Sequence, residues 1–317
     1  MMETVPIRIC ISSCLLGSKV RYDGGHKKDR FVVDHLDPFV EWVQMCPEVE
    51  AGLGIPRPAM RLVDVDGERR LLEIKARTDH TDALRQATEK RVENLREAGL
   101  CGAILKKDSP SCGMARVKVY RDTGMPHKDG VGIFADSLMA HFPDLPVEEE
   151  GRLNDARLRE NFIERIFVYQ RLRQLFLGRW TPGDIVAFHT AHKLQLMAHS
   201  TVIYNELGRL VAHIKKQSRE TFPAEYQGGF MKAMATLATR GKNANVLNHA
   251  AGHLKHLPSE SRQELAALIT DYREGLVPLV TPITLLRHHA RVGAVTYLNG
   301  QTYLEPHPKE LMLRNHV

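Results

Sequence analysis

The spacing of apolar residues changes near residue 150, and this change limits the possible folds more than any other feature of the sequence. Before it, short runs of branched apolar residues alternate with helical spacing. Ile7–Leu16, Cys101–Lys106 and Ala115–Tyr120 favour strands, Phe39–Met45 favours a strand or short helix, and Thr81–Ala98 favours an exposed helix. Strands that alternate with helices predict a mostly parallel sheet with helices on its faces.

After residue 150 only helical spacing remains. One long amphipathic pattern extends to Gly178, and Thr181–Asp184 is a strong helix start, with a hydroxyl cap before a proline. Further helices are predicted at Ile185–Lys216, Pro223–Thr239, Ala244–Leu257 and Ser259–Gly275. Pro278, Pro282 and the polar residues after Asn299 indicate a looser C-terminus.

These patterns predict two domains. We interpret Glu148–Gly151 as the boundary, with an α/β, Rossmann-like domain at 1–150 and an all-α domain at 151–317, in which 151–178 forms a connecting helix. The 317-residue length, with 43% hydrophobic residues, suits two buried cores. No apolar run approaches the ~20 residues of a membrane span, and the N-terminus lacks the features of a signal peptide. We therefore expect a cytoplasmic protein with reduced thiols.

Charge is divided unequally between the two predicted domains. Residues 1–150 contain 22 Lys and Arg against 25 Asp and Glu, a net charge of −3, whereas residues 151–317 contain 22 against 13, a net charge of +9. A basic domain of this kind is typical of nucleic-acid binding, although a solvated helical surface gives the same charge.

Two groups of histidines recur at helical spacing in the basic half. His249, His253 and His256 share one predicted helix face, and His192 and His199 are seven residues apart. No carboxylate accompanies them at ligand spacing, which disfavours a metal site. A polar face that contacts RNA phosphates or stacks on bases fits the charge better, and ordinary surface or core histidines are the alternative.

All five cysteines lie within the first 112 residues, and three share one kind of placement. Cys14, Cys46 and Cys112 each follow an apolar run and lie beside Ser, Pro or Gly. Because the carboxyl ends of parallel strands meet at one edge of a sheet, three segments could bring these thiols to one centre. We interpret Cys10 and Cys101, which lie within strand patterns, as packing residues.

Three converging thiolates leave one coordination position open. With zinc they form a catalytic site, or a structural site completed by a fourth ligand; with a four-iron cluster they leave one iron free to bind substrate. The alternative is that all three are buried packing residues, because cysteine is among the most buried residue types. Turn-forming neighbours at all three positions disfavour that alternative.

Three segments of the first half resemble the signature motifs of the thiouracil desulfidase family: SSCLLGSKVRYDGGHK, CPEVEAGLGIPRPAMRL and LKKDSPSCG. The likeness covers most of residues 7–150. In the second half, HKLQLMAHS, NVLNHAAGHLKH and TDYREGLVPLVTP are similar to a helical domain fused to a subset of these enzymes, which act on 4-thiouridine in nucleotides or RNA. The resemblance implies a [4Fe–4S] cluster bound by Cys14, Cys46 and Cys112.

The implied reaction is hydrolysis of a carbon–sulfur bond without net redox change. Thiocarbonyl sulfur is a soft ligand that an open cluster iron can bind and polarise. Glu48, two residues after Cys46, matches the acidic residue of the family motif and is expected to activate water; its alternative role is a helix N-terminal carboxylate. Ser109 is expected to hydrogen-bond substrate or water, with an ordinary turn serine as the alternative.

Four further residues are candidates for substrate binding. Arg21, Tyr22 and Asp23 precede Gly24–Gly25 in a turn that could lie over the site and contact a pyrimidine edge, or could simply end a strand. Lys106 closes an apolar run before the third motif and is a candidate for contact with an anionic substrate, unless it is solvated. The expected substrates are 4-thiouridine in a nucleotide or tRNA, or 2-thiouracil.

Two other functions fit the same residues. An RNA-binding protein could hold zinc structurally in the three-cysteine site. An iron–sulfur carrier is less suited, because an open position serves substrate binding better than electron transfer. We therefore favour a desulfidase with a helical domain that presents RNA or nucleotide.

Overall fold

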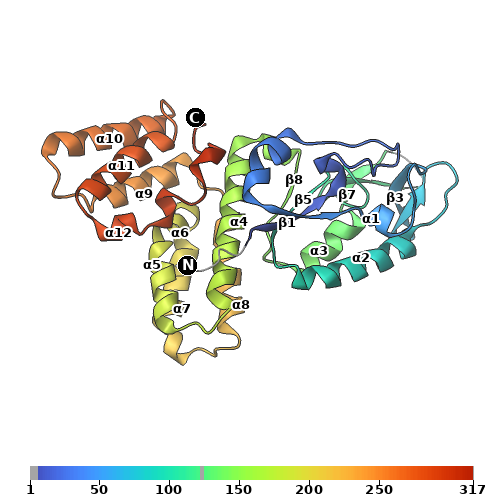
Figure 1. Ribbon diagram of the computed structural model, residues 1–317, viewed down its shortest axis with the longest axis horizontal. Coiled ribbons are helices and arrows are strands. Elements are labelled where there is room, and N and C mark those ends of the chain that lie inside the picture. The colour runs from blue at the N-terminus through green and yellow to red at the C-terminus, as the bar shows by residue number, and fades with distance from the viewer. Residues whose placement is uncertain (1–5, 122–124, 317) are drawn as a thin grey trace. The chain divides into compact units, whose positions relative to one another are not determined.

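The computed structural model describes residues 6–121 and 125–316. Contacts divide the chain into two compact units, Met1–Asp155 and Ala156–Val317 (Figure 1). The first unit is an α/β domain and the second is made of helices, so the fold class predicted from the sequence is confirmed. Within the described residues, no helix is both long enough and apolar enough to cross a bilayer.

A four-stranded parallel sheet forms the centre of the α/β unit. Its strands are β1 (Arg8–Ser12), β2 (Glu41–Met45), β5 (Leu100–Leu105) and β8 (Val147–Glu149), in the order β2–β1–β5–β8. β1 pairs with β2 on one side and β5 on the other, both parallel, and β5 pairs with β8. The chain thus leaves β1 first toward one edge and then toward the other, and ligands of α/β sheets bind at such switch points.

A second, mixed sheet extends the unit in the order β4–β3–β6–β7. Its strands are β3 (Met60–Val65), β4 (Glu68–Glu73), β6 (Val117–Tyr120) and β7 (His127–Gly130). Helices α2 (Thr81–Glu97) and α3 (Ile133–His141) pack side by side (Figure 1). The buried Leu84 of α2 joins apolar residues of β3, β4 and β6 in one core. Only β6 and α2 of these elements were expected from the sequence.

Nine helices follow in the described part of the second unit. They are α4 (Ala156–Phe176), α5 (Pro182–Ala191), α6 (Lys193–His199), α7 (Thr201–Ala212), α8 (Phe222–Ala235), α9 (Arg240–Ala251), α10 (Ser259–Glu274), α11 (Val280–Val292) and α12 (Thr296–Asn299). The predicted start of α5 is confirmed, because Thr181 and Asp184 form a reciprocal capping box around Pro182. Buried side chains of α6 and α9–α12 share one core.

The predicted helix at Ile185–Lys216 is wrong as a single element. It is broken at His192 and again at Ser200, whose backbone is extended. The Ser200 hydroxyl accepts a hydrogen bond from the Ile203 N–H at 3.3 Å and so caps α7. The serine side chain thus replaces a helical hydrogen bond. The helical spacing of apolar residues continues across Ser200, so it did not indicate that the helix ends there.

The C-terminus is also more ordered than predicted. Pro282 lies in the first turn of α11, where no backbone donor is required. The tail after Asn299 forms short 3₁₀ turns and places Arg314 inside the unit with 8% exposure. The proline and polar content that indicated a loose segment instead belongs to a helix start and to a buried polar cluster.

The acidic run Glu148–Gly151, which we interpreted as the boundary, lies just before the division at Asp155, and its carboxylates are not exposed. Val147–Glu149 forms β8, and the side chains of Glu148, Glu149 and Glu150 are all buried. Charged residues are rarely buried without partners, so an acidic triplet alone favours solvent. Here Glu148 accepts from Arg152 Nε at 2.6 Å, and the partners of Glu149 and Glu150 are described with the site below.

The predicted RNA-contacting face of histidines is wrong for two of its members. His192 and His199 are 3% and 2% exposed, respectively, and belong to the interior of the helical unit. His249, His253 and His256 do lie on the surface. The interpretation of His192 and His199 as nucleic-acid contacts is therefore wrong, and they are core histidines.

Candidate active site

A cavity of about 420 Å³ lies at the carboxyl ends of β1, β2 and β5. Its wall contains the residues that follow each strand, together with the turn after β1 and the segment before β3. The volume falls within the ~300–1,000 Å³ of small-molecule sites. The switch point of the parallel sheet therefore contains a cavity of the size that binds small molecules.

The three predicted ligand cysteines all line this cavity. Cys14 lies in a 3₁₀ turn directly after β1, Cys46 is the N-cap residue of the short helix α1 (Pro47–Glu50), and Cys112 lies in the loop after β5. Gly17 closes the first turn with a φ of 101°, a conformation that favours glycine. Turn residues beside each cysteine thus end a strand and direct a thiol into one space.

Burial keeps these thiols protonated when they bind nothing. It raises the pKa of Cys14 to about 11 and also raises the pKa of Cys46 and, most strongly, of Cys112. The neighbouring thiols contribute, since each disfavours ionisation of the next. A metal ligand is the thiolate, so metal binding here would release protons.

This set of donors fits an iron–sulfur cluster. Three cysteine sulfurs are soft ligands of the kind that hold such clusters, and they line a cavity with room for a polynuclear group and a small substrate. No three His, Cys, Asp or Glu side chains in the described part of the chain are arranged to hold a single metal ion as they stand. Cys10 and Cys101 lie within β1 and β5 and are fully buried, so they pack in the sheet.

Glu48 reaches the cavity with both carboxylate oxygens engaged. Arg57 donates to Oε2 through Nε at 2.7 Å and through its Nη2 group, and Ser111 Oγ donates to Oε1 at 2.6 Å. Arg57 also donates to the Val20 carbonyl oxygen at 3.0 Å, which links Glu48 to the turn after β1. The carboxylate is fixed by groups from two other segments.

Arg57 and Ser111 were missed from the sequence, although both lie inside quoted motifs. Arg57 is in GLGIPRPAM and Ser111 immediately precedes Cys112. They are 9 and 63 residues from Glu48, and no local pattern relates these positions. The position of Glu48 beside Cys46 was the one available signal: a carboxylate in a ligand-lined cavity requires a nearby cation, which the sequence does not identify.

Ser109 shapes the loop that carries Cys112. Its hydroxyl oxygen accepts hydrogen bonds from the backbone N–H groups of Ser111 at 3.2 Å and Cys112 at 3.1 Å. The side chain also lines the cavity. The hydroxyl proton is therefore still available to a ligand, because an accepting hydroxyl can donate as well.

Two carboxylates at the end of β8 fasten both ends of the same loop. Glu150 accepts from the Lys107 N–H at 2.8 Å and pairs with the Lys106 ammonium group, and Glu149 accepts from the Met114 N–H at 2.9 Å. Lys106 lines the cavity, but its charge is thus shared with a buried partner. The end of β8 therefore positions the Cys112 loop.

We expect Glu150→Gln to lower the free energy of unfolding by about 1.5–3 kcal/mol, because it replaces hydrogen bonds to a charged acceptor with weaker ones. Urea denaturation measures the change, and faster reaction of the Cys112 thiol with a maleimide would report loosening of the loop. Glu97→Gln, at an exposed position in α2, is the matched control. Equal stability of the two variants would show that Glu150 does not hold the loop.

The turn after β1 brings two of its three candidates to the cavity. Arg21 and Tyr22 line it, and the Arg21 guanidinium lies 5.4 Å from the centre of the Tyr22 ring. Asp23 does not line it; the Asp23 carboxylate accepts from the Gly25 N–H at 2.9 Å and shapes the turn. The structure therefore brings together every predicted site residue except Asp23.

The parallel α/β sheet thus gathers three thiols, a fixed carboxylate and a serine around one cavity at its switch point, where sheets of this class bind small ligands. Comparison with known families agrees. Residues 9–150 match the family described as 2-thiouracil desulfurase, and residues 193–308 match a family described as protein of unknown function, DUF1722. The chain belongs to the 2-thiouracil desulfurase family and joins that domain to a DUF1722 region.

Individual relatives cover one part of the chain each. The uncharacterized protein YbgA of Escherichia coli (strain K12) is 32% identical over 165 residues, which is 51% of this chain and 98% of YbgA. The uncharacterized protein YbbK of Bacillus subtilis (strain 168) is 32% identical over 156 residues, 46% of this chain and 98% of YbbK. A solved structure described as the [4Fe–4S]-dependent thiouracil desulfidase TudS is 30% identical, with a TM-score of 0.40, over 49% of this chain and 97% of its own.

Proposed function

We propose that this protein is a [4Fe–4S]-dependent desulfidase that converts thiolated uracil to uracil and hydrogen sulfide. One observation carries the proposal: three cysteine thiols and Glu48 line one cavity within the residues that match the 2-thiouracil desulfurase family. The proposed substrates are 4-thiouridine in a nucleotide or tRNA, with 2-thiouracil as the free-base counterpart.

Cys14, Cys46 and Cys112 would hold the cluster. When bound, the cluster supplies a soft Lewis acid that can polarise the thiocarbonyl bond of the substrate. Glu48 then has a defined task, since a carboxylate offers about four lone-pair sites and Arg57 and Ser111 leave room for one more donor. We assign Glu48 as the base that takes a proton from the attacking water.

Other residues of the cavity orient the reactants. The Ser109 hydroxyl can donate to the substrate while it continues to accept from the loop backbone. Arg57 keeps the Glu48 carboxylate in one orientation. The oxygen of water replaces the sulfur, which leaves as hydrosulfide, and no electron is gained or lost.

Substrate recognition is assigned to the mouth of the cavity. The Tyr22 ring is 42% exposed there, and aromatic rings stack on nucleobases. Arg21 and Lys106 place positive charge beside it and are suited to an anionic nucleotide. Asp23 contributes through the turn that carries Arg21 and Tyr22.

Anaerobically prepared protein tests the proposal directly. A brown protein that releases sulfide from 4-thiouridine monophosphate, with uridine monophosphate as the product, is the expected result. A colourless protein that contains one zinc ion, binds RNA and releases no sulfide would instead establish the structural-zinc alternative.

We further propose that the helical unit presents RNA to the enzyme. Its net charge is +9 over residues 151–317, and Lys215, Lys216 and Arg219 are exposed between α7 and α8. Arg219 lies 5.2 Å from the centre of the Trp180 ring, which places a cation beside an aromatic side chain. Cations next to aromatic rings are typical of surfaces that bind single-stranded RNA.

Charge reversal at Lys215, Lys216 and Arg219 together is expected to weaken binding of thiolated tRNA at least tenfold and to reduce the log–log salt slope by up to about 3 units, because fewer phosphates are neutralised. Filter binding across a salt series measures both. The control is a triple reversal at the exposed Arg262, Arg273 and Lys309. An equal loss with the control set would show that total charge, and not this surface, determines affinity.

A further inference from the structure

The helical unit contains a cavity of its own, larger than the thiol-lined one. It has a volume of about 560 Å³ and lies among the first turns of α4, the end of α6, the start of α9 and the C-terminal tail. The proposed desulfidation uses none of its residues. This volume falls within the ~300–1,000 Å³ typical of small-molecule sites.

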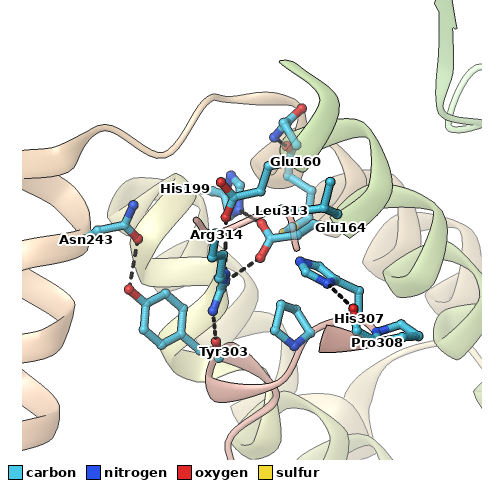
Figure 2. Close-up of polar contacts among 12 residues, drawn as sticks. Glu160, Glu164, His199, Asn243, Tyr303, His307, Pro308, Leu313 and Arg314 are labelled. Atoms are coloured by element: carbon cyan, nitrogen blue, oxygen red, sulfur yellow. Dashed lines mark hydrogen bonds and ion pairs between the residues drawn. The ribbon is translucent and has the colours of Figure 1, made fainter. Parts of the chain in front are cut away.

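The floor of this cavity is a buried network of charges (Figure 2). Glu164 is at its centre: Oε1 accepts from Arg314 Nη2 at 2.6 Å, and Oε2 lies 3.0 Å from His199 Nε2. All three residues are at most 8% exposed. Burial opposes ionisation of Glu164, but Arg314 and His199 outweigh it and lower its pKa to about 2.

The second carboxylate of the floor, that of Glu160, is more exposed than that of Glu164. Glu160 Oε1 accepts from Arg314 Nε at 3.1 Å, and its side chain is 15% exposed. Burial, reinforced by Glu164, raises the pKa of Glu160 to about 7 in spite of Arg314. The raised pKa favours the protonated form of Glu160, which can donate a hydrogen bond as well as accept one.

Aromatic and amide groups form one wall. Tyr303 donates to Asn243 Oδ1 at 2.9 Å, and Asn243 Nδ2 donates to the Tyr272 hydroxyl oxygen at 3.2 Å (Figure 2 shows the first of these). Asn161 also lines the cavity and uses its Nδ2 to donate to the Met234 carbonyl at 2.9 Å. The Asn161 carbonyl oxygen can thus still accept a hydrogen bond.

Cations dominate the mouth of the cavity. Arg157 and Arg240 line it and are exposed, whereas the charged groups of the floor are buried. With Arg314, His199 and His316, five basic side chains line a cavity that contains two carboxylates, and His316 Nε2 lies 3.5 Å from Glu160 Oε2. Helix α9 begins at Arg240, so the positive end of its dipole adds to the guanidinium charges.

We propose that this cavity binds a nucleoside monophosphate, with the phosphate at Arg157 and Arg240 and the nucleoside between the tyrosine wall and Glu160. The excess of positive charge at the mouth selects an anion. The interior provides hydrogen-bond partners for a heterocycle or ribose, and aromatic surface for its rings. A free nucleotide and the terminal nucleotide of an RNA have this chemistry in common.

A purely structural network does not require this arrangement. Buried ion pairs contribute little net stability, because desolvation offsets their attraction. A network that served only to hold the C-terminal tail through Arg314 would also not need an open cavity beside it. Buried charged groups that line an open cavity, with pKa values perturbed by burial and by their charged neighbours, are typical of binding and catalytic sites. The inference concerns the helical unit and does not depend on the proposed desulfidase activity.

Isothermal titration of the full-length protein with uridine monophosphate, uridine and inorganic phosphate tests the proposal. We expect uridine monophosphate to bind at least tenfold more tightly than either fragment. Arg240→Glu should weaken this binding at least tenfold, whereas Arg262→Glu, an exposed charge reversal on α10, should not. Circular dichroism confirms that both variants are folded.

The thiol-lined cavity is a second candidate site for uridine monophosphate, and the variant Tyr22→Ala is expected to weaken binding there. Binding that responds to Tyr22→Ala but not to Arg240→Glu would overturn the proposal, as would phosphate that binds as tightly as the nucleotide, or no saturable binding. An oligoribonucleotide with a terminal phosphate is then tested as a competitor, beside its dephosphorylated form. If only the phosphorylated form displaces uridine monophosphate, an RNA terminus is the natural ligand. If neither form displaces it, the free nucleotide is.

Discussion

Replacement of Cys14, Cys46 or Cys112 by alanine is expected to abolish cluster assembly in each case. The three thiols enter one cavity from three strand ends, so the loss of any one removes a ligand that no other described cysteine can replace. Iron and acid-labile sulfide content after anaerobic reconstitution measures assembly. We expect both to fall to background together with sulfide release from the substrate.

Cys10→Ala and Cys101→Ala are the matched controls. Both thiols are fully buried within β1 and β5 and do not line the cavity. They should cost stability through lost packing but leave the cluster in place. A colourless Cys10→Ala protein beside a brown Cys14→Ala protein would show that the ligands are assigned wrongly.

Glu48→Gln is expected to keep the cluster but lower kcat by a factor on the order of 10²–10⁴, the range for loss of a general acid or base. Glutamine preserves the shape of the side chain: its one carbonyl oxygen can still accept from Arg57, and its amide group can donate to the Ser111 hydroxyl oxygen in place of the bond that Ser111 donates to Glu48. It cannot take a proton from water. Steady-state kinetics with 4-thiouridine monophosphate, alongside iron content, separates catalysis from assembly.

KM should change little in this variant, because Glu48 is assigned to the water and not to the substrate. Glu97→Gln, on the surface of α2, controls for the loss of one carboxylate. Near-normal turnover of a folded Glu48→Gln protein with a full cluster would remove Glu48 from the mechanism.

The cysteines and Glu48 could be predicted from the sequence because their signal is local. Each cysteine follows a strand and is next to residues that form turns, and the topology of a parallel sheet then brings strand ends together. Glu48 is two residues from a ligand, so its position follows from that of Cys46. The fold class follows in the same way from periodicity.

The features that were missed depend on contacts between distant segments. Ser111 meets Glu48 across 63 residues, and Arg314 meets Glu164 across 150. The acidic run at Glu148–Glu150 indicated only a boundary, because nothing nearby in the sequence shows that Lys106 and the loop backbone bind Glu150. Burial of charge is decided by tertiary partners, which apolar periodicity does not encode.

The place of β8 in the chain has a consequence for the order of biosynthesis. During translation, Cys46 and Cys14 leave the ribosome 103 and 135 residues before Glu149. Glu149 and Glu150 hold the two ends of the Cys112 loop. The three thiols acquire their final arrangement only after the last strand of the sheet has been made and has docked.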